Sequence, residues 1–142
     1  MLKIIVITHG TFSEGIRSSL EMILGKQEEF LTYSILENCD LESVKSELND
    51  ELEKSSASGQ EVLFLSDLFF GTPFNLITPL MEHHRFFHIT GINLPLVMEI
   101  VSNRNAEDIP GMLQESLSLG QSAMLDCVDY LKSAMGSRKE DY

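Results

Sequence analysis

The chain has 142 residues, of which 43% are hydrophobic, and its 22 acidic against 10 basic side chains give a formal net charge of −12. This length fits one domain with its own core and is too short for two ordinary domains. The acidic balance argues against nucleic acid or an anionic membrane surface as a partner and would steer a basic protein toward the chain.

The other bulk properties favour a cytoplasmic protein. The longest apolar stretches are far shorter than the roughly 20 residues that span a bilayer, and no cleavage site follows the residues after Met1. Cys39 and Cys127 are widely spaced and fit no metal-ligand pattern. We therefore expect reduced thiols and no metal.

Strand-like and helix-like segments alternate along the chain, which predicts an α/β fold: a single doubly wound domain with a mostly parallel sheet covered on both faces. In chain order, strands are expected at residues 3–7, 30–36, 61–66 and 86–90. The first two helices are expected to begin at the N-caps Ser13 and Asp40, and to end at Gly25 and at a turn over residues 55–59. Three later helices are expected at residues 73–81, 95–101 and 109–124.

The carboxy-terminal pattern leaves two structures open. From Leu125 onward, both a continued helix and a short added strand fit the residues, and the polar segment 136–142 is typical of a frayed end. We expect one domain over residues 1–133 and a C-terminal tail over residues 134–142.

Two strand ends carry the predicted site. The half-exposed second strand suits an edge, so right-handed crossovers give the order 2-1-3-4 and make strands one and three neighbours. Ligands bind at such a switch point, outside the carboxyl ends of the strands. His9 leaves the first strand there and Asp67 leaves the third. A carboxylate on one ring nitrogen would fix the tautomer and leave the other nitrogen as a nucleophile.

Small and hydroxylated residues surround this pair, ahead of two predicted helix starts: Gly10, Thr11, Gly71 and Thr72. Each of these short motifs alone is also typical of a turn or a cap. Together, because helix N-termini suit phosphate oxygens, they predict a phosphoryl carrier. No P-loop pattern is present, so the phosphate is expected from a protein donor. The remaining histidines are interpreted as non-catalytic: His83, His84 and His88.

Four blocks in chain order resemble the enzyme IIA domain of the mannose family of the bacterial sugar phosphotransferase system: residues 8–10, 21–28, 63–75 and 91–99. The resemblance covers roughly residues 1–125. It implies that His9 is the phosphorylated histidine and that Asp67 orients it.

The same resemblance places Thr72 where the family usually has serine, with Phe74 and Asn75 completing the phosphate loop. One departure is Phe70, where the family usually has the first glycine of a pair. This change removes no chemical group but alters the rim that faces protein partners.

The resemblance also implies partners. A phosphotransferase component of this kind takes a phosphoryl group from phospho-HPr on His9 and passes it to a IIB component, without a cofactor. The membrane components IIC and IID would be indirect partners, so we expect a cytoplasmic protein recruited to the inner face of the membrane. Family members are homodimers with a short exchanged antiparallel edge strand, for which the segment after Gly120 is the candidate. No long linker to a IIB domain follows, so we expect a free-standing IIA component.

Other functions stay open at this point. A regulatory module could accept phosphate on His9 without passing it on, and a relative with the same fold serves dihydroxyacetone kinase. A receiver domain would need an acidic pair where His9 stands, and a metal hydrolase would need a third ligand beside His9 and Asp67. The sequence does not specify the sugar.

Overall fold

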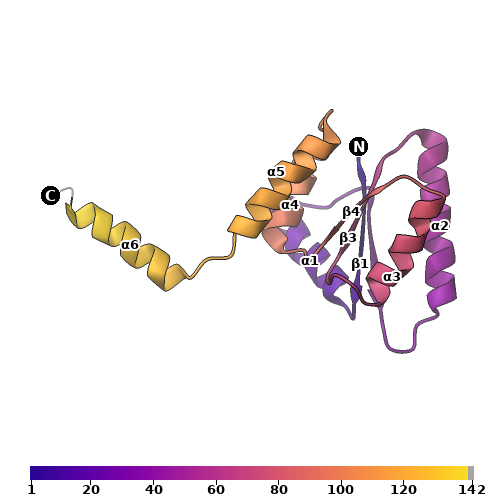
Figure 1. The fold of residues 1–142 in the computed structure, drawn as a ribbon, viewed down its shortest axis with the longest axis horizontal. Helices are drawn as coiled ribbons and strands as arrows, with labels where there is room; N and C mark the ends of the chain where they lie inside the picture. Colours follow the sequence, from indigo (N-terminus) through magenta and orange to yellow (C-terminus); the bar gives the residue numbers. More distant parts are fainter. Residues whose placement is uncertain (141–142) are drawn as a thin grey trace.

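The computed structural model describes residues 1–140 and the side chains through residue 136. Four parallel strands form one sheet between two helical layers, in the order β2-β1-β3-β4 (Figure 1). The strands are β1 (Lys3–His9), β2 (Phe30–Ile35), β3 (Val62–Ser66) and β4 (Phe87–Thr90). This is the predicted α/β fold and strand order, so the switch point lies between the paired strands β1 and β3.

The helices divide between the two faces of the sheet. One face is covered by α1 (Phe12–Leu24), α4 (Leu94–Ser102) and α5 (Ile109–Ser122). The other face is covered by α2 (Leu41–Ser58), α3 (Thr72–Ile77) and the 3₁₀ helix η1 (Thr78–Glu82). A last helix, α6 (Cys127–Glu140), follows a short connection.

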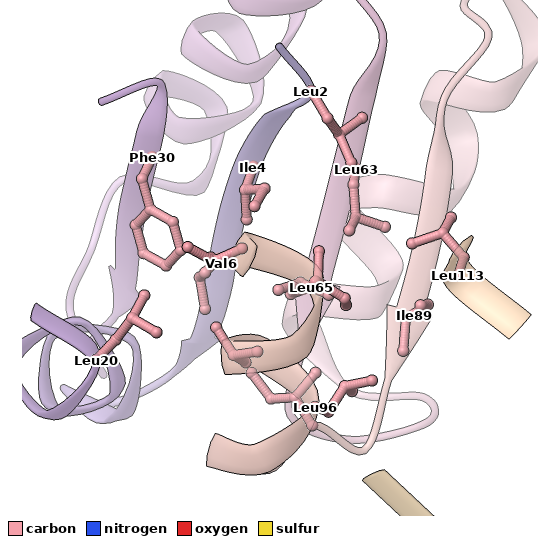
Figure 2. Packing of buried hydrophobic residues seen from close by; sticks show 14 of the residues in the cluster. Leu2, Ile4, Val6, Leu20, Phe30, Leu63, Leu65, Ile89, Leu96 and Leu113 are labelled. Carbon is pink, nitrogen blue, oxygen red and sulfur yellow. The ribbon is translucent and has the colours of Figure 1, made fainter. Parts of the chain in front are cut away.

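The core has two halves because successive side chains of a strand point to opposite faces. In β1, Ile4 and Val6 pack with α1 and α4, whereas Ile5 and Ile7 pack with α2 and α3. Figure 2 shows the first half, where residues of β1 and β3 meet Leu20 and Leu96 from the covering helices. Strands covered on both faces need no polar alternation, which explains the continuous apolar runs in the sequence.

Two predicted helix boundaries differ from the structure. The N-cap of α1 is Thr11, and Ser13 lies buried inside the helix, because its backbone N–H donates to the hydroxyl of Thr8 (2.8 Å). The α2 helix runs through the expected turn and stops only at Gly59, which takes the left-handed conformation that favours glycine (φ +71°). The predicted N-cap of α2 is confirmed, since the Asp40 carboxylate accepts the N–H of Ser43.

The segment predicted as one helix over residues 73–81 consists of α3 followed by η1. Pro79 explains the change of helix type, because it has no backbone N–H to donate to the carbonyl four residues earlier. The chain therefore tightens into a 3₁₀ turn before it reaches β4.

The residues after Gly120 form helix and not strand. The structure continues α5 to Ser122 and then forms α6, which stands away from the body of the domain (Figure 1). The expected boundary after residue 133 falls inside α6, and the segment predicted to fray is helical through Glu140; Asp141 and Tyr142 lie outside the described residues. Within residues 1–140, no helix combines the length and apolar character needed to cross a membrane.

Candidate functional site

The two predicted residues at the switch point are hydrogen-bonded. His9 is the last residue of β1, and Asp67 directly follows β3. Oδ2 of Asp67 accepts both the backbone N–H of His9 and its ring Nδ1, each at 2.9 Å, while Oδ1 accepts the backbone N–H of Leu68 at 3.0 Å. The carboxylate is thus held by N–H groups from two strand ends.

This arrangement distinguishes the two ring nitrogens of His9. An ionised carboxylate only accepts hydrogen bonds, so Nδ1 of His9 carries the proton and Nε2 keeps its lone pair. The His9 side chain is 45% exposed, whereas that of Asp67 is 12% exposed. The pair therefore presents an oriented imidazole to solvent and shields the carboxylate that orients it.

Gly71 lies against the reactive edge of this imidazole. Its φ is +102°, a conformation that side-chain-bearing residues rarely adopt. A Cβ at this position would lie 3.0 Å from Cε1 and 3.3 Å from Nε2 of His9. Only glycine therefore leaves room beside the nucleophilic nitrogen, and Thr72 begins α3 immediately afterwards.

An open hollow of about 480 Å³ adjoins the histidine. Its walls come from the ends of β1 and β2 and the first residues of α2 and α3: His9, Gly10, Ile35, Leu36, Glu37, Cys39, Leu41 and Thr72. The backbone N–H of Gly10 donates to the carbonyl of Ile35 at 2.9 Å, so this amide anchors the wall of the hollow.

Three other predicted site residues do not line this hollow. Thr11 is an exposed N-cap, Asn75 is exposed on α3 with its backbone N–H bonded to the carbonyl of Gly71, and Phe74 packs among aromatic rings. None of the three is among the described residues that line the hollow. The structure thus gathers His9, Asp67, Gly10, Gly71 and Thr72 and leaves Thr11, Phe74 and Asn75 outside.

An aromatic patch, made of Phe69, Phe70 and Phe74, stands next to this group. The ring of Phe70 lies 4.1 Å from that of Phe69 and 5.2 Å from that of Phe74, between centroids. Phe70 has φ +62°, so the chain keeps at this position the left-handed backbone that glycine adopts at little cost. Leu68, Phe69 and Phe70 are all exposed, so the segment that precedes Gly71 presents an apolar surface beside the site.

Sequence reasoning missed the polar side chains behind the site. Ser66, the last residue of β3, contacts Nε2 of His88 at 2.7 Å, and burial holds the pKa of His88 below its ordinary value. Because successive side chains of a strand point to opposite faces, the register of β1, β3 and β4 places both side chains on the same face as His9, and the sequence does not give that register. Glu37 and Cys39 also line the hollow, but no sequence pattern pointed to them, because they follow β2 in an irregular connection.

The other histidines lie at the opposite edge. His83 and His84 precede the amino end of β4, where they line a separate cavity of about 530 Å³. Nε2 of His84 is 2.8 Å from Oδ1 of Asn49. Among the side chains that the structure describes, through residue 136, no group of three His, Cys, Asp or Glu residues is placed to hold a metal ion.

The protein is thus an α/β protein with an open parallel sheet and a carboxylate-oriented histidine at its switch point, where sheets of this kind bind their ligands. The family model for the PTS system fructose IIA component, EIIA-man, matches residues 3–117. The chain belongs to this family, and it is accordingly a phosphocarrier component of a sugar phosphotransferase system.

Individual relatives agree with this membership. The PTS system fructose-specific EIIA component of Bacillus subtilis is 27% identical over 99% of both chains. The PTS system mannose-specific EIIAB component of Escherichia coli is 30% identical over 73% of this chain, which spans only 32% of that longer protein. The crystal structure of EIIA from Streptococcus agalactiae has a TM-score of 0.81 at 30% identity, covering 91% of this chain and 99% of the other.

Proposed function

We propose that Nε2 of His9 carries the phosphoryl group, accepts it from phospho-HPr and passes it to a IIB component. The observation that supports this most directly is the hydrogen bond of 2.9 Å between Nδ1 of His9 and Asp67, which leaves Nε2 as the exposed nucleophile. The family of the chain supplies the kind of donor and acceptor. No nucleotide or other cofactor takes part in this step.

The transfer is a displacement at phosphorus. The Nε2 lone pair forms a new N–P bond while the N–P bond of the donor phosphohistidine breaks, and the donor nitrogen keeps the electron pair. The His9 ring then bears a proton on Nδ1 and the phosphoryl group on Nε2, so positive charge develops on the imidazole. The Asp67 carboxylate stabilises that charge, and the second transfer reverses the steps toward the acceptor.

The residues beside His9 have distinct proposed roles. Gly71 leaves space at Nε2, and Thr72 and Gly10 line the hollow where the phosphoryl oxygens would lie. Thr11 and Asn75, which are exposed nearby, would reach these oxygens only once a partner protein closes the site. Phe74 has no hydrogen-bonding side chain, so its role is to support the loop that carries Gly71 and Thr72.

The partner proteins would dock over His9. The aromatic patch flanks Gly71 in the chain, and its exposed members Phe69 and Phe70 offer the apolar centre that a protein interface needs. Through the IIB component the chain would meet the membrane components IIC and IID, which places it in the cytoplasm. The relatives reported above are named for different sugars, so no sugar is proposed.

A homodimer is the proposed assembly. In Figure 1, α6 extends away from the body of the domain. Apolar side chains on and before this arm are exposed: Met124, Leu125, Val128, Leu131 and Met135. A second copy would cover them, in the role that the exchanged strand plays in the family.

The test is incubation of the protein with phosphoenolpyruvate, enzyme I and HPr. The wild-type chain should gain one acid-labile phosphate, and His9→Ala should gain none while keeping its fold by circular dichroism. Asp67→Asn should be phosphorylated about 10²- to 10⁴-fold more slowly, because the amide cannot stabilise the developing imidazolium. Phosphate that still appears on His9→Ala would overturn the proposal.

The same assay separates a carrier from a regulatory module. When a cognate IIB protein is added to the phosphorylated chain, the label should move to IIB. Label that stays on the chain would favour the regulatory alternative over the relay.

A further inference from the structure

A polar cluster lies beneath α3, at the carboxyl ends of two strands. The cluster is made of Ser66 from β3 and His88 and Thr90 from β4. The register pairs Phe64 with His88 and Ser66 with Thr90, and Ile7 of β1 pairs with Ser66. Side chains two residues apart share a face, so the cluster lies on the same face of the sheet as His9.

The hydrogen bonds in this cluster run in one direction. The Ser66 hydroxyl donates to Oγ1 of Thr90 at 2.9 Å. A serine hydroxyl has a single proton, so the contact of 2.7 Å between Ser66 Oγ and His88 Nε2 needs a proton from the histidine. With Ser66 donating to Thr90, the hydrogen bonds assign the Nε2–H tautomer to His88, and the two strands hold its ring in one orientation.

The ring of Phe74 rests against this imidazole. The two ring centroids are 5.8 Å apart with an interplanar angle of 35°, while Phe69 contacts the same phenyl ring edge-on at 5.1 Å. Phe74 is two residues after Thr72 in α3. Phe74, in the first turn of the helix that follows Gly71, thus contacts both the His88 ring and the ring of Phe69.

We propose that His88 is a positioning residue for phosphoryl transfer: its Nε2–H, bonded to Ser66, fixes the ring on which Phe74 rests and so sets the position of Gly71 and Thr72 beside His9. This inference rests on the proposed function, in which Nε2 of His9 is the acceptor. A misplacement on the order of 1 Å in such a group costs up to about 100-fold in rate.

The tautomer is tested first, by ¹⁵N NMR of the imidazole nitrogens near pH 7.5. We expect a protonated Nε2 and an unprotonated Nδ1 for His88 in the wild-type chain, and the loss of this fixed pattern in Ser66→Ala. A protonated Nδ1 in the wild-type chain would overturn the proposal. This result does not depend on phosphoryl transfer.

The kinetic test uses single-turnover phosphorylation by phospho-HPr over a range of donor concentrations. His88→Phe keeps an aromatic ring under Phe74 but loses the donor, and Ser66→Ala loses the acceptor. Each should lower the saturating rate constant about 10- to 100-fold, with the half-saturating donor concentration unchanged. Because both break the same bond, the double variant should be no slower than the slower single variant.

The matched control is His84→Phe. His84 also contacts an oxygen through Nε2 at 2.8 Å, but at the other edge of the sheet, so the variant should keep the wild-type rate constant. Wild-type rates in His88→Phe and Ser66→Ala, or independent losses that multiply in the double variant, would overturn the proposal. If the wild-type chain is not phosphorylated at all, the proposed function is wrong. The NMR experiment still determines the tautomer of His88 in that case, because it does not depend on phosphorylation.

Discussion

At the scale of single residues, one carboxylate oxygen organises the site. Oδ2 of Asp67 accepts from both the backbone and the ring of His9, so the strand end and the imidazole are fixed together. This geometry assigns the proton to Nδ1 and the chemistry to Nε2. Gly71 lies against the reactive edge of this ring, and in our proposal His88 sets the position of Gly71 through Phe74.

Gly71→Ala should slow the phosphorylation of His9. The added Cβ would lie 3.3 Å from Nε2 and would push the ring away from Asp67, in addition to a backbone strain of about 1–2 kcal/mol at φ +102°. The matched control is Gly25→Ala, at φ +84° with no heavy atom within 4 Å of the new Cβ. Both variants should lose similar stability in urea unfolding, but only Gly71→Ala should lose rate. Equal phosphorylation rates would contradict this role of Gly71.

The stability of the wild-type chain should fall faster than that of His88→Phe as the pH drops from 7 to 5. Burial lowers the pKa of His88 in the folded protein from its ordinary 6.5. The unfolded chain therefore takes up a proton below pH 6.5 that the folded chain resists, so the stability contribution is full above 6.5 and is lost below it. One proton limits this difference in slope to about 1.4 kcal/mol per pH unit. Urea unfolding at each pH measures this difference. If the free energy of unfolding changed with pH in the same way for both proteins, the prediction would be contradicted.

At the scale of elements, the amino edge of the sheet depends on one arginine after α4. The guanidinium of Arg104 is buried and donates to the backbone carbonyls of Leu2, Glu28 and Glu29, at 2.6–3.1 Å. These bonds tie the starts of β1 and β2 to the helix layer. They fix the starts of these two strands relative to each other, at the edge of the sheet opposite His9.

Arg104→Ala should destabilise the fold by about 3 kcal/mol or more, because it removes four hydrogen bonds from a charged donor, two of them to the buried carbonyl of Leu2. Arg85→Ala is the control, since Arg85 is exposed and should change stability by less than about 0.5 kcal/mol. Thermal unfolding measures both. At a temperature where Arg104→Ala remains folded, its His9 should be phosphorylated normally, and a stability equal to that of Arg85→Ala would contradict the role of Arg104.

The strand order and the His9–Asp67 pair were predictable because they depend on local patterns. Residues 62–65 are apolar throughout, whereas residues 30–35 alternate, and this difference places one strand in the centre and the other at the edge. The contact between Ser66 and His88 was not predictable, because it requires the register of two strands that are far apart in sequence. The extent of α2 was missed because a run of serine and alanine fits either helix or turn.

The carboxy-terminal arm shows a different limit of sequence reasoning. The residues from Leu125 onward fit a helix or a strand, because they have no regular apolar pattern that would select between the two. The structure forms α6 there with exposed apolar side chains. Which conformation such a segment adopts in an assembly depends on a partner surface that the pattern of one chain does not encode.

At the scale of the whole molecule, the proposed homodimer depends on this arm. A chain ending at residue 123 should be a monomer in sedimentation equilibrium at concentrations where the full chain is a dimer, because the arm carries apolar side chains that a second copy would bury. The matched control is the full chain with Leu125→Ser, Val128→Ser and Leu131→Ser, which should also be monomeric. A dimer that persists in both variants, or a monomeric full chain, would contradict the proposed interface.

In the whole molecule, the candidate site and the hydrogen bonds of Arg104 lie at opposite edges of the sheet. His9, Gly71 and the aromatic patch meet at the carboxyl ends of the strands, while Arg104 holds the amino ends. A phosphocarrier needs this separation, because its reactive edge must stay open to two protein partners in turn. The central claim is therefore about one nitrogen at that edge.

The most direct test of that claim is ³¹P and ¹⁵N NMR of the chain after phosphorylation by phosphoenolpyruvate, enzyme I and HPr. The account predicts a single phosphohistidine at His9, with phosphorus coupled to Nε2 and the proton retained on Nδ1 toward Asp67. Phosphorus on Nδ1 of His9, on another histidine, or on the Asp67 carboxylate would contradict it.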